Sequence, residues 1–547
     1  MPKLIINSIN AFLKQIIGYF KVKTAEKNKS NQIDCFSIGI DVGTSGIRLV
    51  VVNGQAEMLC EELVLFTDLE REGLIVWDEE KRLNVTLVTE IIDNQIKLIQ
   101  DKFPTLFINT LSFSSIGPSI VFLDENGNPI GRAFTYAYQG AEEHVVHLPK
   151  DFQAKIGGLY SASLPYVQLL EVKNKKLVTE YAKITTINDY LTWQMTELPL
   201  EELFTTVPNA SYTGLYSLQS QDWDETFLKN VGLKRKHMPK IIPLGTIYPI
   251  RKSKVDKFPI LKDTKIVAGT IDGIDAFWAA GVKQGEKILV GSASTTGALR
   301  RWRKNPTNHF HSRLVLCCHI VDADWVEIIP FNNVGTSLHW LANVFYSSSN
   351  YKEFLEADNR LNLDLLEKLA WKKIKNKKDN LKAFLDDLPV YFPYGPEGEP
   401  RGPHGRGKNV PGGFVNIKAT HDGIDQYIAL QIGLVCMYRH NLEVLNPPED
   451  YKEIRLTGTV AQKCSLFRYL LATITGKNIG ILEKEQSVAW ATAMRALVYS
   501  QHITEFPKVL VSDLTKPSRH KLKIALDDIY RTYIMIYEDP DSYTFQS

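Results

Sequence analysis

The sequence predicts an α/β protein of two large domains preceded by an amphipathic helix. The chain has 547 residues, which is more than one compact core usually accommodates. Short runs of apolar and β-branched residues begin near residue 36 and again near residue 265, and helical patterns follow each of them. We therefore expect an N-terminal domain over residues 35–264, a C-terminal domain over residues 265–505 and a C-terminal tail over residues 506–547.

Residues 1–34 differ in character from the rest of the chain. In "KLIINSINAFLKQIIGYFK" apolar residues recur at helical spacing, and lysine and asparagine occupy the opposite face. Three interpretations stay open for this amphipathic helix: peripheral contact with a membrane through residues 1–23, docking on a partner, or packing on its own domain. The stretch lacks the apolar core and cleavage site of a secretory signal, and the polar run after it is typical of a linker.

Composition excludes several classes of protein. The apolar share of 44% and the charged share of 23% are ordinary for a globular protein, and no stretch reaches the ~20 apolar residues of a membrane span. A formal charge of +2 gives no electrostatic reason to expect nucleic acid as a partner. The six cysteines are scattered, which favours a reducing, cytoplasmic setting over disulfides or a metal site. A homodimer stays open.

The N-terminal domain contains four runs typical of strands and one typical of a helix. The strands are "SIGIDV", "IRLVVV", "TLSFSSI" and "SIVFLD", and the helix is "RLNVTLVTEIIDNQIKLIQDKF". "FLDENGNPIGRAF" predicts a hairpin, because Asn126 and Gly127 suit the positive-φ positions of a tight turn. Residues 150–260 have a mostly helical pattern.

The C-terminal domain repeats the order of strand, turn and strand. "KIVAGTIDGIDAFWAAG" is followed by "KILVGSASTTGALRRW" and "WVEIIPFNNVG", and residues 420–500 alternate long helices with the strand "EIRLTG". Both "GIDVGTSG" and "VGSASTTG" place hydroxyls and glycine after an apolar run. These parallels indicate an approximate internal duplication.

The interrupted run "DVGTSGIR" has the composition of an anion site. Glycine at Gly43 lets backbone N–H groups approach an anion, Thr44 and Ser45 add hydroxyl donors, and Arg48 adds a planar cation. Asp41 at the end of the strand is suited to a hydrated Mg²⁺ that bridges phosphates. The alternative is a β-hairpin with a glycine-rich turn. Neither P-loop nor GxGxxG spacing is present.

A second group of chemically suggestive residues lies more than two hundred residues later. Asp272 opens an apolar helix, where it is either an N-cap or a general base for an attacking hydroxyl, and Asp275 competes for both roles. The run from Ser292 to Gly297 offers another cluster of hydroxyl donors. Two anion-friendly turns and an isolated carboxylate are what phosphoryl transfer between two domains requires.

Together these runs resemble the FGGY carbohydrate kinases of the actin-like ATPase superfamily. The resemblance extends from about residue 36 to residue 500 and implies two actin-like (ribonuclease H-like) domains with a cleft between them. "GIDVGTSGIR" resembles the first phosphate motif, which implies that Asp41 contacts the metal and that Gly43, Thr44, Ser45 and Arg48 lie near the transferred phosphate. "GTIDGIDAFWAAG" is similar to the family's "GGGDxxAxxxGxG", which implies that Asp272 is the catalytic base.

Three further segments carry what the resemblance implies about the nucleotide. "SASTTG" resembles the second phosphate motif and implies contacts from Ser294, Thr295 and Thr296. "VGTSLHWL" resembles the helix start "AGASLRWL" and implies a role for Gly335. "RLTGTVAQKCSLFRYLLATITGKNI" resembles the adenosine motif "GGGAxSxxWxQxxADxxGxPV" and implies roles for Gly458 and Thr459, although Thr459 and Val460 stand where glycine is usual.

The sugar-binding motifs depart further from the family pattern. "SSIGPSI" stands where many members have "SGQMHG", and "TYAYQGA" stands where they have "LWNDxR". The usual tryptophan, aspartate and arginine contacts therefore do not transfer. Ser115, Tyr136 and Tyr138, together with Asp272, are the candidate substrate residues.

The resemblance implies phosphorylation of a sugar or polyol hydroxyl with ATP and Mg²⁺. Many members of the family act on ketoses, so a pentulose such as xylulose or ribulose, or a heptulose, is the first expectation, with glycerol and gluconate left open. The alternative is a degenerate kinase that binds sugar or nucleotide as a sensor or scaffold. The altered adenosine motif favours this alternative, and the retained Asp41, Thr44, Arg48 and Asp272 oppose it.

Overall fold

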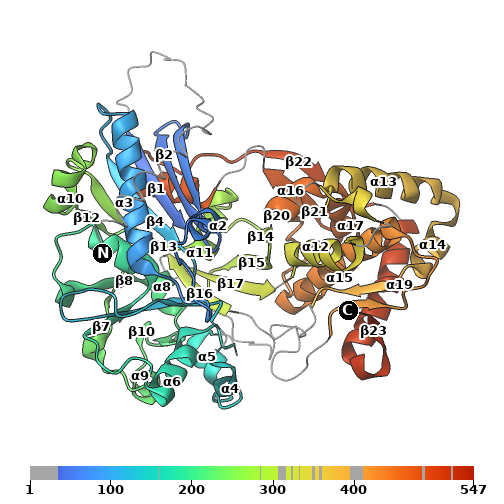
Figure 1. Cartoon of the computed structure of the whole chain (residues 1–547), viewed down its shortest axis with the longest axis horizontal. Coiled ribbons are helices and arrows are strands. Elements are labelled where there is room, and N and C mark those ends of the chain that lie inside the picture. The colour runs from blue at the N-terminus through green and yellow to red at the C-terminus, as the bar shows by residue number, and fades with distance from the viewer. Residues whose placement is uncertain are drawn as a thin grey trace.

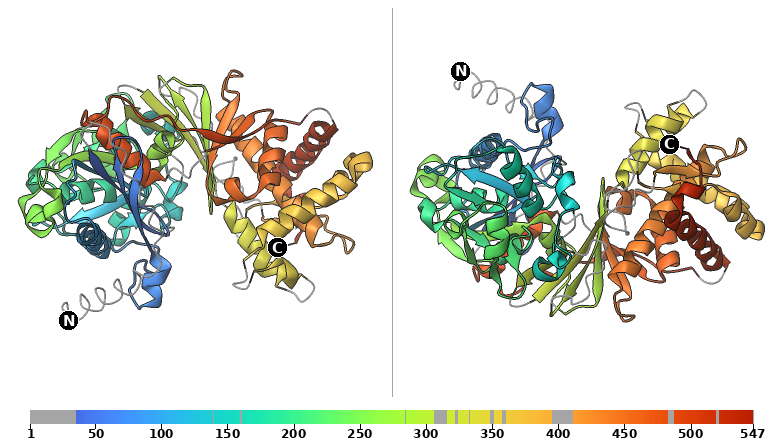
Figure 2. Two further views of the ribbon diagram at one scale, coloured as in Figure 1. Left: turned by 90° about the horizontal axis from the view of Figure 1, so that it is seen from above. Right: turned by 90° about the horizontal axis from the view of Figure 1, so that it is seen from below.

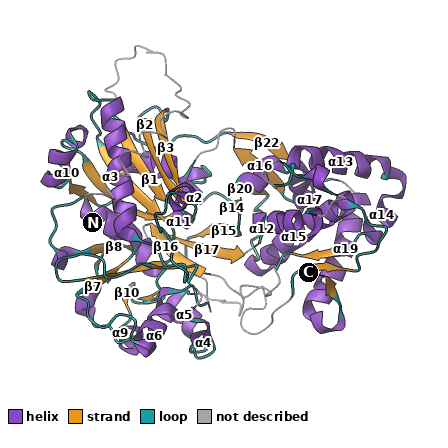
Figure 3. Cartoon of the chain, in the orientation of Figure 1, coloured by secondary structure: helices purple, strands orange, loops and turns teal. Residues whose placement is uncertain are grey.

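The computed structural model describes residues 35–546 with short gaps. These gaps are residues 139, 159–160, 284, 306–315, 322–323, 332, 348–350, 357–359, 395–410, 483–486 and 519–520. The amphipathic helix expected within residues 1–34 lies outside the described residues. Two parts lie side by side along the long axis (Figure 1), and each contains a mixed β-sheet with helices packed against it (Figure 3).

The N-terminal part is built on a six-stranded sheet among the described residues, with the order β12-β13-β4-β1-β2-β3. Strand β1 is antiparallel to β2 and parallel to β4, and β4 is parallel to β13. The four strands expected at the start of this part are confirmed as β1, β2, β4 and β5 (Ser119–Leu123), of which the first three lie in this sheet. The bounds are β1 Phe36–Val42, β2 Gly46–Asn53, β3 Met58–Leu65, β4 Thr110–Ser115, β12 Ile247–Pro249 and β13 Lys265–Ile271.

Helices from distant parts of the chain cover this sheet. Helix α3 (Val85–Lys102) buries an isoleucine-rich face in the same core cluster as the strands. Helix α18 (Val488–Tyr499) returns from the far end of the chain and packs on β1, β2 and β4. Figure 2 shows it as a red-orange helix among blue and green elements. A Cβ at Gly39 would lie 2.0 Å from the carbonyl oxygen of Ala489, so the close approach of β1 and α18 requires glycine.

Residues 116–250 form an irregular layer of short helices and short strands, whereas the sequence predicts a mostly helical region over residues 150–260. The predicted hairpin is present, since β5 pairs antiparallel with β6, and Gly127 has φ +78°. Asn126 is not among the residues with positive φ, so of the two predicted positions only Gly127 adopts the left-handed conformation. The strands are β5 Ser119–Leu123, β6 Phe134–Thr135, β7 Lys183–Thr185, β8 Phe204–Thr206, β9 Tyr216–Ser217, β10 Asp222–Trp223 and β11 Lys240–Ile242. The helices are α4 Glu142–Val145, α5 Phe152–Ile156, α6 Pro165–Lys175, α7 Ile187–Gln194, α8 Val207–Ser211, α9 Glu225–Asn230 and α10 Lys252–Lys257, with α2 (Phe66–Arg71) following β3.

The C-terminal part is built on a seven-stranded sheet within the described ranges, with the order β16-β17-β15-β14-β20-β21-β22. Its largest hydrophobic core lies between this sheet and the long helix α15 (Gly423–Leu445). The strands are β14 Ile288–Ala293, β15 Gly297–Arg303, β16 Leu316–Val321, β17 Asp324–Phe331, β20 Glu453–Thr457, β21 Asn478–Leu482 and β22 Val511–Thr515. The other elements are α12 Gly335–Trp340 with a π-helix at Leu341–Tyr346, α13 Leu363–Asn376, α14 Leu381–Asp387, β18 Val390–Phe392, β19 Gly413–Val415, α16 Thr459–Lys463, α17 Ser465–Thr475, α19 Lys521–Glu538 and β23 Phe545–Gln546.

The domain boundaries differ from those expected at two places. Strand β13 belongs to the first sheet, and α11 (Asp272–Ala279) follows it directly, so the second sheet begins with β14 and not at residue 265. Residues 506–547 do not form a tail, because β22 pairs with β21 and α19 buries Tyr533 and Tyr537 in the C-terminal core. The described helices include none that is long and apolar enough to cross a lipid bilayer.

Candidate active site

The first candidate phosphate turn connects β1 to β2. The Gly43 N–H donates to the Gly46 carbonyl over 2.9 Å and closes the turn, which leaves the side chains of Thr44 and Ser45 exposed. The turn is therefore a hairpin turn that also presents two hydroxyls. Arg48 lies across the strand pair from Asp41, but its guanidinium is paired with Glu61 on β3.

Asp41 lies near the C-terminal end of β1, opposite Ser114 near the end of β4 and close to the start of α11. Its Oδ1 is buried and has no hydrogen-bond partner among the residues that the structure describes. Burial, followed by the nearby charges of Asp272 and Asp275, raises the pKa of Asp41 to about 7, and Arg48 opposes the rise. An orphaned carboxylate oxygen beside two other acids fits a hard cation such as Mg²⁺.

Asp272 is the first residue of α11, directly after β13. Its Oδ1 accepts a hydrogen bond of 2.6 Å from the N–H of Gly273. Burial raises the pKa of Asp272 to about 6, an effect that Arg300 and the N–H groups of Gly273 and Gly117 oppose. A carboxylate that is ionised at neutral pH and still basic is suited to accept a proton from a hydroxyl.

Asp275, one turn further along α11, is occupied by other protein groups. Its carboxylate accepts hydrogen bonds from the Arg495 guanidinium at 2.8 and 3.2 Å and from the Thr492 hydroxyl at 2.9 Å. The side chains of Asp275 and Arg495 are both fully buried. Asp275 therefore attaches α11 to α18, and of the two carboxylates only Asp272 is left without a basic side chain bonded to it.

The second candidate phosphate turn lies between β14 and β15, against two other glycine-containing segments. Gly335 donates to the Ser294 carbonyl at 2.7 Å, and a Cβ at Gly335 would lie 2.7 Å from that oxygen. Gly458 has φ +101°, and a Cβ there would lie 2.3 Å from Ser294 Oγ. The three segments therefore need glycine at Gly335 and Gly458 in order to pack this closely.

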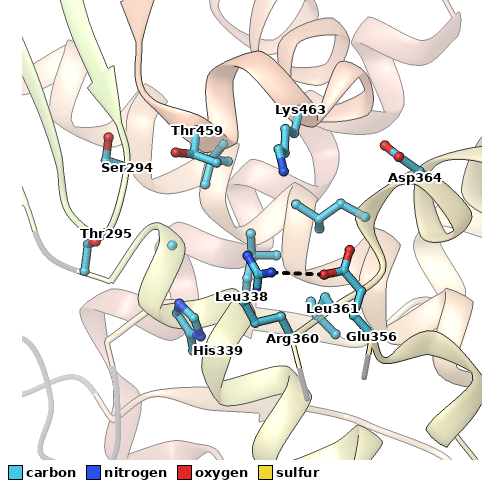
Figure 4. A pocket seen from close by; sticks show the side chains of 13 residues that line it. Ser294, Thr295, Leu338, His339, Glu356, Arg360, Leu361, Asp364, Thr459 and Lys463 are labelled. Carbon is cyan, nitrogen blue, oxygen red and sulfur yellow. Dashed lines mark ion pairs between the residues drawn. The ribbon is translucent and has the colours of Figure 1, made fainter. Parts of the chain in front are cut away.

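A pocket of about 230 Å³ opens where these segments meet (Figure 4). Ser294, Thr295, Gly335 and Thr459 line it, whereas Thr296 is exposed on the turn and Gly458 lies beneath it. Sequence patterns had not indicated the other polar lining residues. Among these, Glu356 and Arg360 form an ion pair of 3.4 Å; the remaining ones are His339, Asp364 and Lys463. Lys463 follows Thr459 by four residues on α16, a helical spacing that could have revealed it.

The candidate substrate residues do not converge. Ser115 is buried at the end of β4, in register with Val42 and Ile271, and is therefore close to Asp41 and Asp272. Tyr138 is 3% exposed and packs edge-on against Phe134 in a separate core cluster. Tyr136 lies in the turn after β6. The structure thus brings Ser115 to the candidate site and places Tyr138 in the hydrophobic interior.

Comparison with known proteins agrees with this arrangement. Residues 36–278 match the N-terminal domain of the FGGY family of carbohydrate kinases. The chain is 23% identical over 490 residues to a gluconokinase from Bacillus subtilis, covering 87% of this chain and 89% of the relative. It is 21% identical over 518 residues to a xylulose kinase from Staphylococcus xylosus, covering 92% of this chain and 100% of the relative.

Solved structures give the same result for the fold. A ligand-bound xylulose kinase and a gluconate kinase, both from Lactobacillus acidophilus, each superpose with a TM-score of 0.78 at 20% identity. Each alignment covers 92% of this chain and 98% of the solved one. At this identity the solved structures show that the fold is shared. The match of the family model over residues 36–278 and the relatives that align over most of the chain identify it as a member of the FGGY family of carbohydrate kinases, ATP-dependent phosphotransferases that act on an alcohol group.

Proposed function

We propose that Asp272 is the general base of this kinase and accepts the proton of the acceptor hydroxyl. The observation that carries the proposal is the contrast between the two acids of α11. Asp275 is neutralised by Arg495, whereas Asp272 has no bonded cation among the described residues and a pKa raised to about 6. As the proton moves to Asp272, the acceptor oxygen bonds to the γ-phosphorus and the bond to ADP breaks.

Asp41 is our candidate for holding Mg²⁺, because its Oδ1 is buried without a hydrogen-bond partner among the described residues and the charges of Asp272 and Asp275 raise its pKa. A bound Mg²⁺ would neutralise the charge of the β- and γ-phosphates. Thr44 and Ser45 lie in the turn directly after β1, and their exposed hydroxyls are suited to bind phosphate oxygens. Arg48 reaches a phosphate only if it leaves Glu61, so we assign it a weaker role than Thr44 and Ser45.

The pocket between β14, α12 and α16 is our proposed nucleotide site. Ser294 and Thr295 lie at its phosphate end, and Thr296 extends the same turn. The side chains of Thr459 and Val460 occupy the place where the family usually has glycine, so they narrow the space for the ribose and base.

Three classes of acceptor stay open at the level of the relatives. Xylulose kinases, gluconokinases and glycerol kinases are all among the similar proteins, and their acceptors are a ketose, a sugar acid and a polyol. The sequence favours a ketose, a pentulose or heptulose. The narrowed nucleotide pocket also supports a second candidate function, a kinase-like protein that binds sugar or nucleotide without efficient turnover.

An ADP-release assay tests this proposal. Purified protein is incubated with Mg²⁺-ATP and a panel of ketoses, polyols and aldonates, beside the variant Asp272→Ala. Acceptor-dependent ADP release that is lost in the variant supports a kinase that uses Asp272. Binding of ATP without turnover on any acceptor would instead support the sensor, and full activity of the variant would remove Asp272 from the chemistry.

A further inference from the structure

A histidine and two glutamates meet between α4 and α6, outside the candidate active site. His144 Nε2 lies 2.7 Å from Oε2 of Glu171 and 3.7 Å from Oε1 of Glu143. One donor atom of each residue lies within 4.8 Å of the other two, and no second group of three or more His, Cys, Asp or Glu side chains in the described part of the chain meets this limit. Helices α4 and α6 pack against each other at the lower end of the N-terminal part (Figure 1).

Glu171 is the buried member of this cluster, and its charge has limited compensation. Its side chain is fully buried, that of His144 is 10% exposed, and Glu143 lies at the surface. Oε1 of Glu171 forms an ion pair of 2.5 Å with Lys175, but this contact lacks the geometry of a hydrogen bond. Lys175 is 55% exposed, and an ion pair with an exposed partner contributes little.

Glu171 is ionised at neutral pH. Burial acts to raise the pKa of Glu171, whereas the neighbouring Lys175 and His144 lower it, and the balance is a lowered pKa. An ionised carboxylate only accepts hydrogen bonds, so Nε2 of His144 is the donor of their 2.7 Å contact. Metal ions bind the deprotonated forms of both groups, so a cation would take the place of that shared proton.

We propose that Glu143, His144 and Glu171 bind Zn²⁺, with water as the fourth ligand. A tetrahedral Zn²⁺ about 2.1 Å from each donor holds neighbouring donor atoms about 3.4 Å apart. The separations of 2.7 and 3.7 Å lie on either side of this value, so small rotations of the side chains complete the site. An imidazole with two carboxylates suits Zn²⁺, whereas Mg²⁺ prefers six oxygen ligands. The proposal goes beyond the proposed function and does not depend on it.

A metal ion at this place would attach the segment between β6 and α5 to α6. Glu143 and His144 belong to that segment, and Glu171 belongs to the helix. One turn earlier on α6, Nε2 of Gln168 donates to the carbonyl of Thr135 at 2.7 Å, just before the same segment. Zn²⁺ would add a second and stronger attachment, and such coupling of metal binding to local folding is the property of a structural site.

The alternative is a polar network in which Lys175 and His144 only neutralise Glu171. This network has no use for Glu143, whose carboxylate lies near the same imidazole nitrogen. The two interpretations differ in their prediction for Lys175. If the cluster binds a cation, the ammonium of Lys175 competes with it, and the variant Lys175→Met should bind Zn²⁺ more tightly.

Calorimetric titration of the full chain with Zn²⁺ tests the proposal. The protein is first treated with EDTA, and the titration is carried out in excess Mg²⁺ so that sites made of hard oxygen ligands are occupied. We expect one equivalent of Zn²⁺ to bind. The Kd should rise at least about tenfold in Glu143→Gln and about 100-fold in Glu171→Gln. Co²⁺ in place of Zn²⁺ should give a visible absorption spectrum that Glu171→Gln abolishes.

His147→Gln is the matched control, because His147 is an exposed histidine of the same segment that lies outside the cluster. It should leave the Kd for Zn²⁺ unchanged. Absence of Zn²⁺ binding to the unmodified protein would overturn the proposal. So would a Kd that neither glutamate variant changes, or weaker binding in Lys175→Met.

The surface position of Glu143 keeps the test decisive if Glu171→Gln does not fold. Circular dichroism of each variant verifies the fold, and removal of the exposed Glu143 carboxylate leaves the buried contact between His144 and Glu171 in place. The titration requires neither ATP nor an acceptor. A protein that phosphorylates no acceptor and still binds Zn²⁺ through this cluster would therefore contradict the proposed function alone.

Discussion

Replacing Asp272 with asparagine should abolish catalysis and stabilise the fold at the same time. The substitution keeps the size of the side chain and removes its ability to take a proton. General-base catalysis typically contributes 10²–10⁴-fold, so we expect kcat to fall by about that factor. A change in KM for ATP is not expected, because Asp272 does not line the nucleotide pocket.

The stabilisation follows from the pKa of Asp272. Burial raises this pKa from 3.8 to about 6, so the folded chain holds the proton more tightly than the unfolded chain does. Between these two pH values the folded state loses stability as the pH rises, and each pH unit corresponds to about 1.4 kcal/mol. At pH 8 the ionised carboxylate therefore destabilises the fold by roughly 3 kcal/mol, and Asp272→Asn should recover up to that amount. At pH 5 about half of the gain should remain.

Thermal unfolding at pH 8 and pH 5, beside the ADP-release assay, measures both effects. Asp275→Asn is the control on the same helix, since it leaves Arg495 buried without its carboxylate. Loss of one partner of a buried pair costs about 3–5 kcal/mol, so this variant should be strongly destabilised. If Asp272→Asn lowers the melting temperature at pH 8, or keeps activity within a few fold, our account of Asp272 is wrong.

Three other predictions concern pH, the metal and the end of the chain. The value of kcat/KM at saturating Mg²⁺ should be constant above pH 7 and fall about tenfold for each pH unit below about 6, because Asp272 acts when deprotonated; a flat profile down to pH 5 contradicts this role. Asp41→Asn should raise the Mg²⁺ concentration needed for half-maximal activity at least tenfold, seen in Mg²⁺ titrations, and an unchanged titration would exclude Asp41 as a ligand. Truncation after residue 505 should give insoluble protein, because it removes Tyr533 and Tyr537 from the core; a soluble truncated chain with a normal melting curve would refute this.

The sequence was informative where chemistry depends on short local motifs. Apolar runs broken by glycine predict the strand ends that carry Asp41 and Asp272. The structure brings both residues to the C-terminal ends of the strands that flank β4. It was misleading where the assignment depends on packing between distant segments. Nothing local in residues 488–499 indicates that α18 covers β1, and the boundary at residue 265 divided β13 from its own sheet.

The sequence alone also could not distinguish side chains of the same type that point to opposite faces of one strand. Arg300, Arg301 and Arg303 look alike in the sequence, and only the pairing of β15 with β17 shows that two of them share Glu327. For Tyr138, the sequence motif suggested a functional role that the packing of the side chain does not support. An aromatic residue at a motif position suggests a sugar contact, but its ring completes an apolar cluster with Phe134.

The distribution of charge explains why the acids around α11 have different roles. Three carboxylates converge there, and a fold tolerates such a group only when each charge is compensated. Arg495 compensates Asp275 through direct hydrogen bonds, which leaves that residue no freedom for chemistry. Within the described part of the chain, no cationic side chain is bonded to Asp41 or Asp272, and burial of these uncompensated carboxylates raises the pKa of each. A metal cation bound at Asp41 would compensate the buried charge of that carboxylate. A proton taken from the acceptor would neutralise the carboxylate of Asp272.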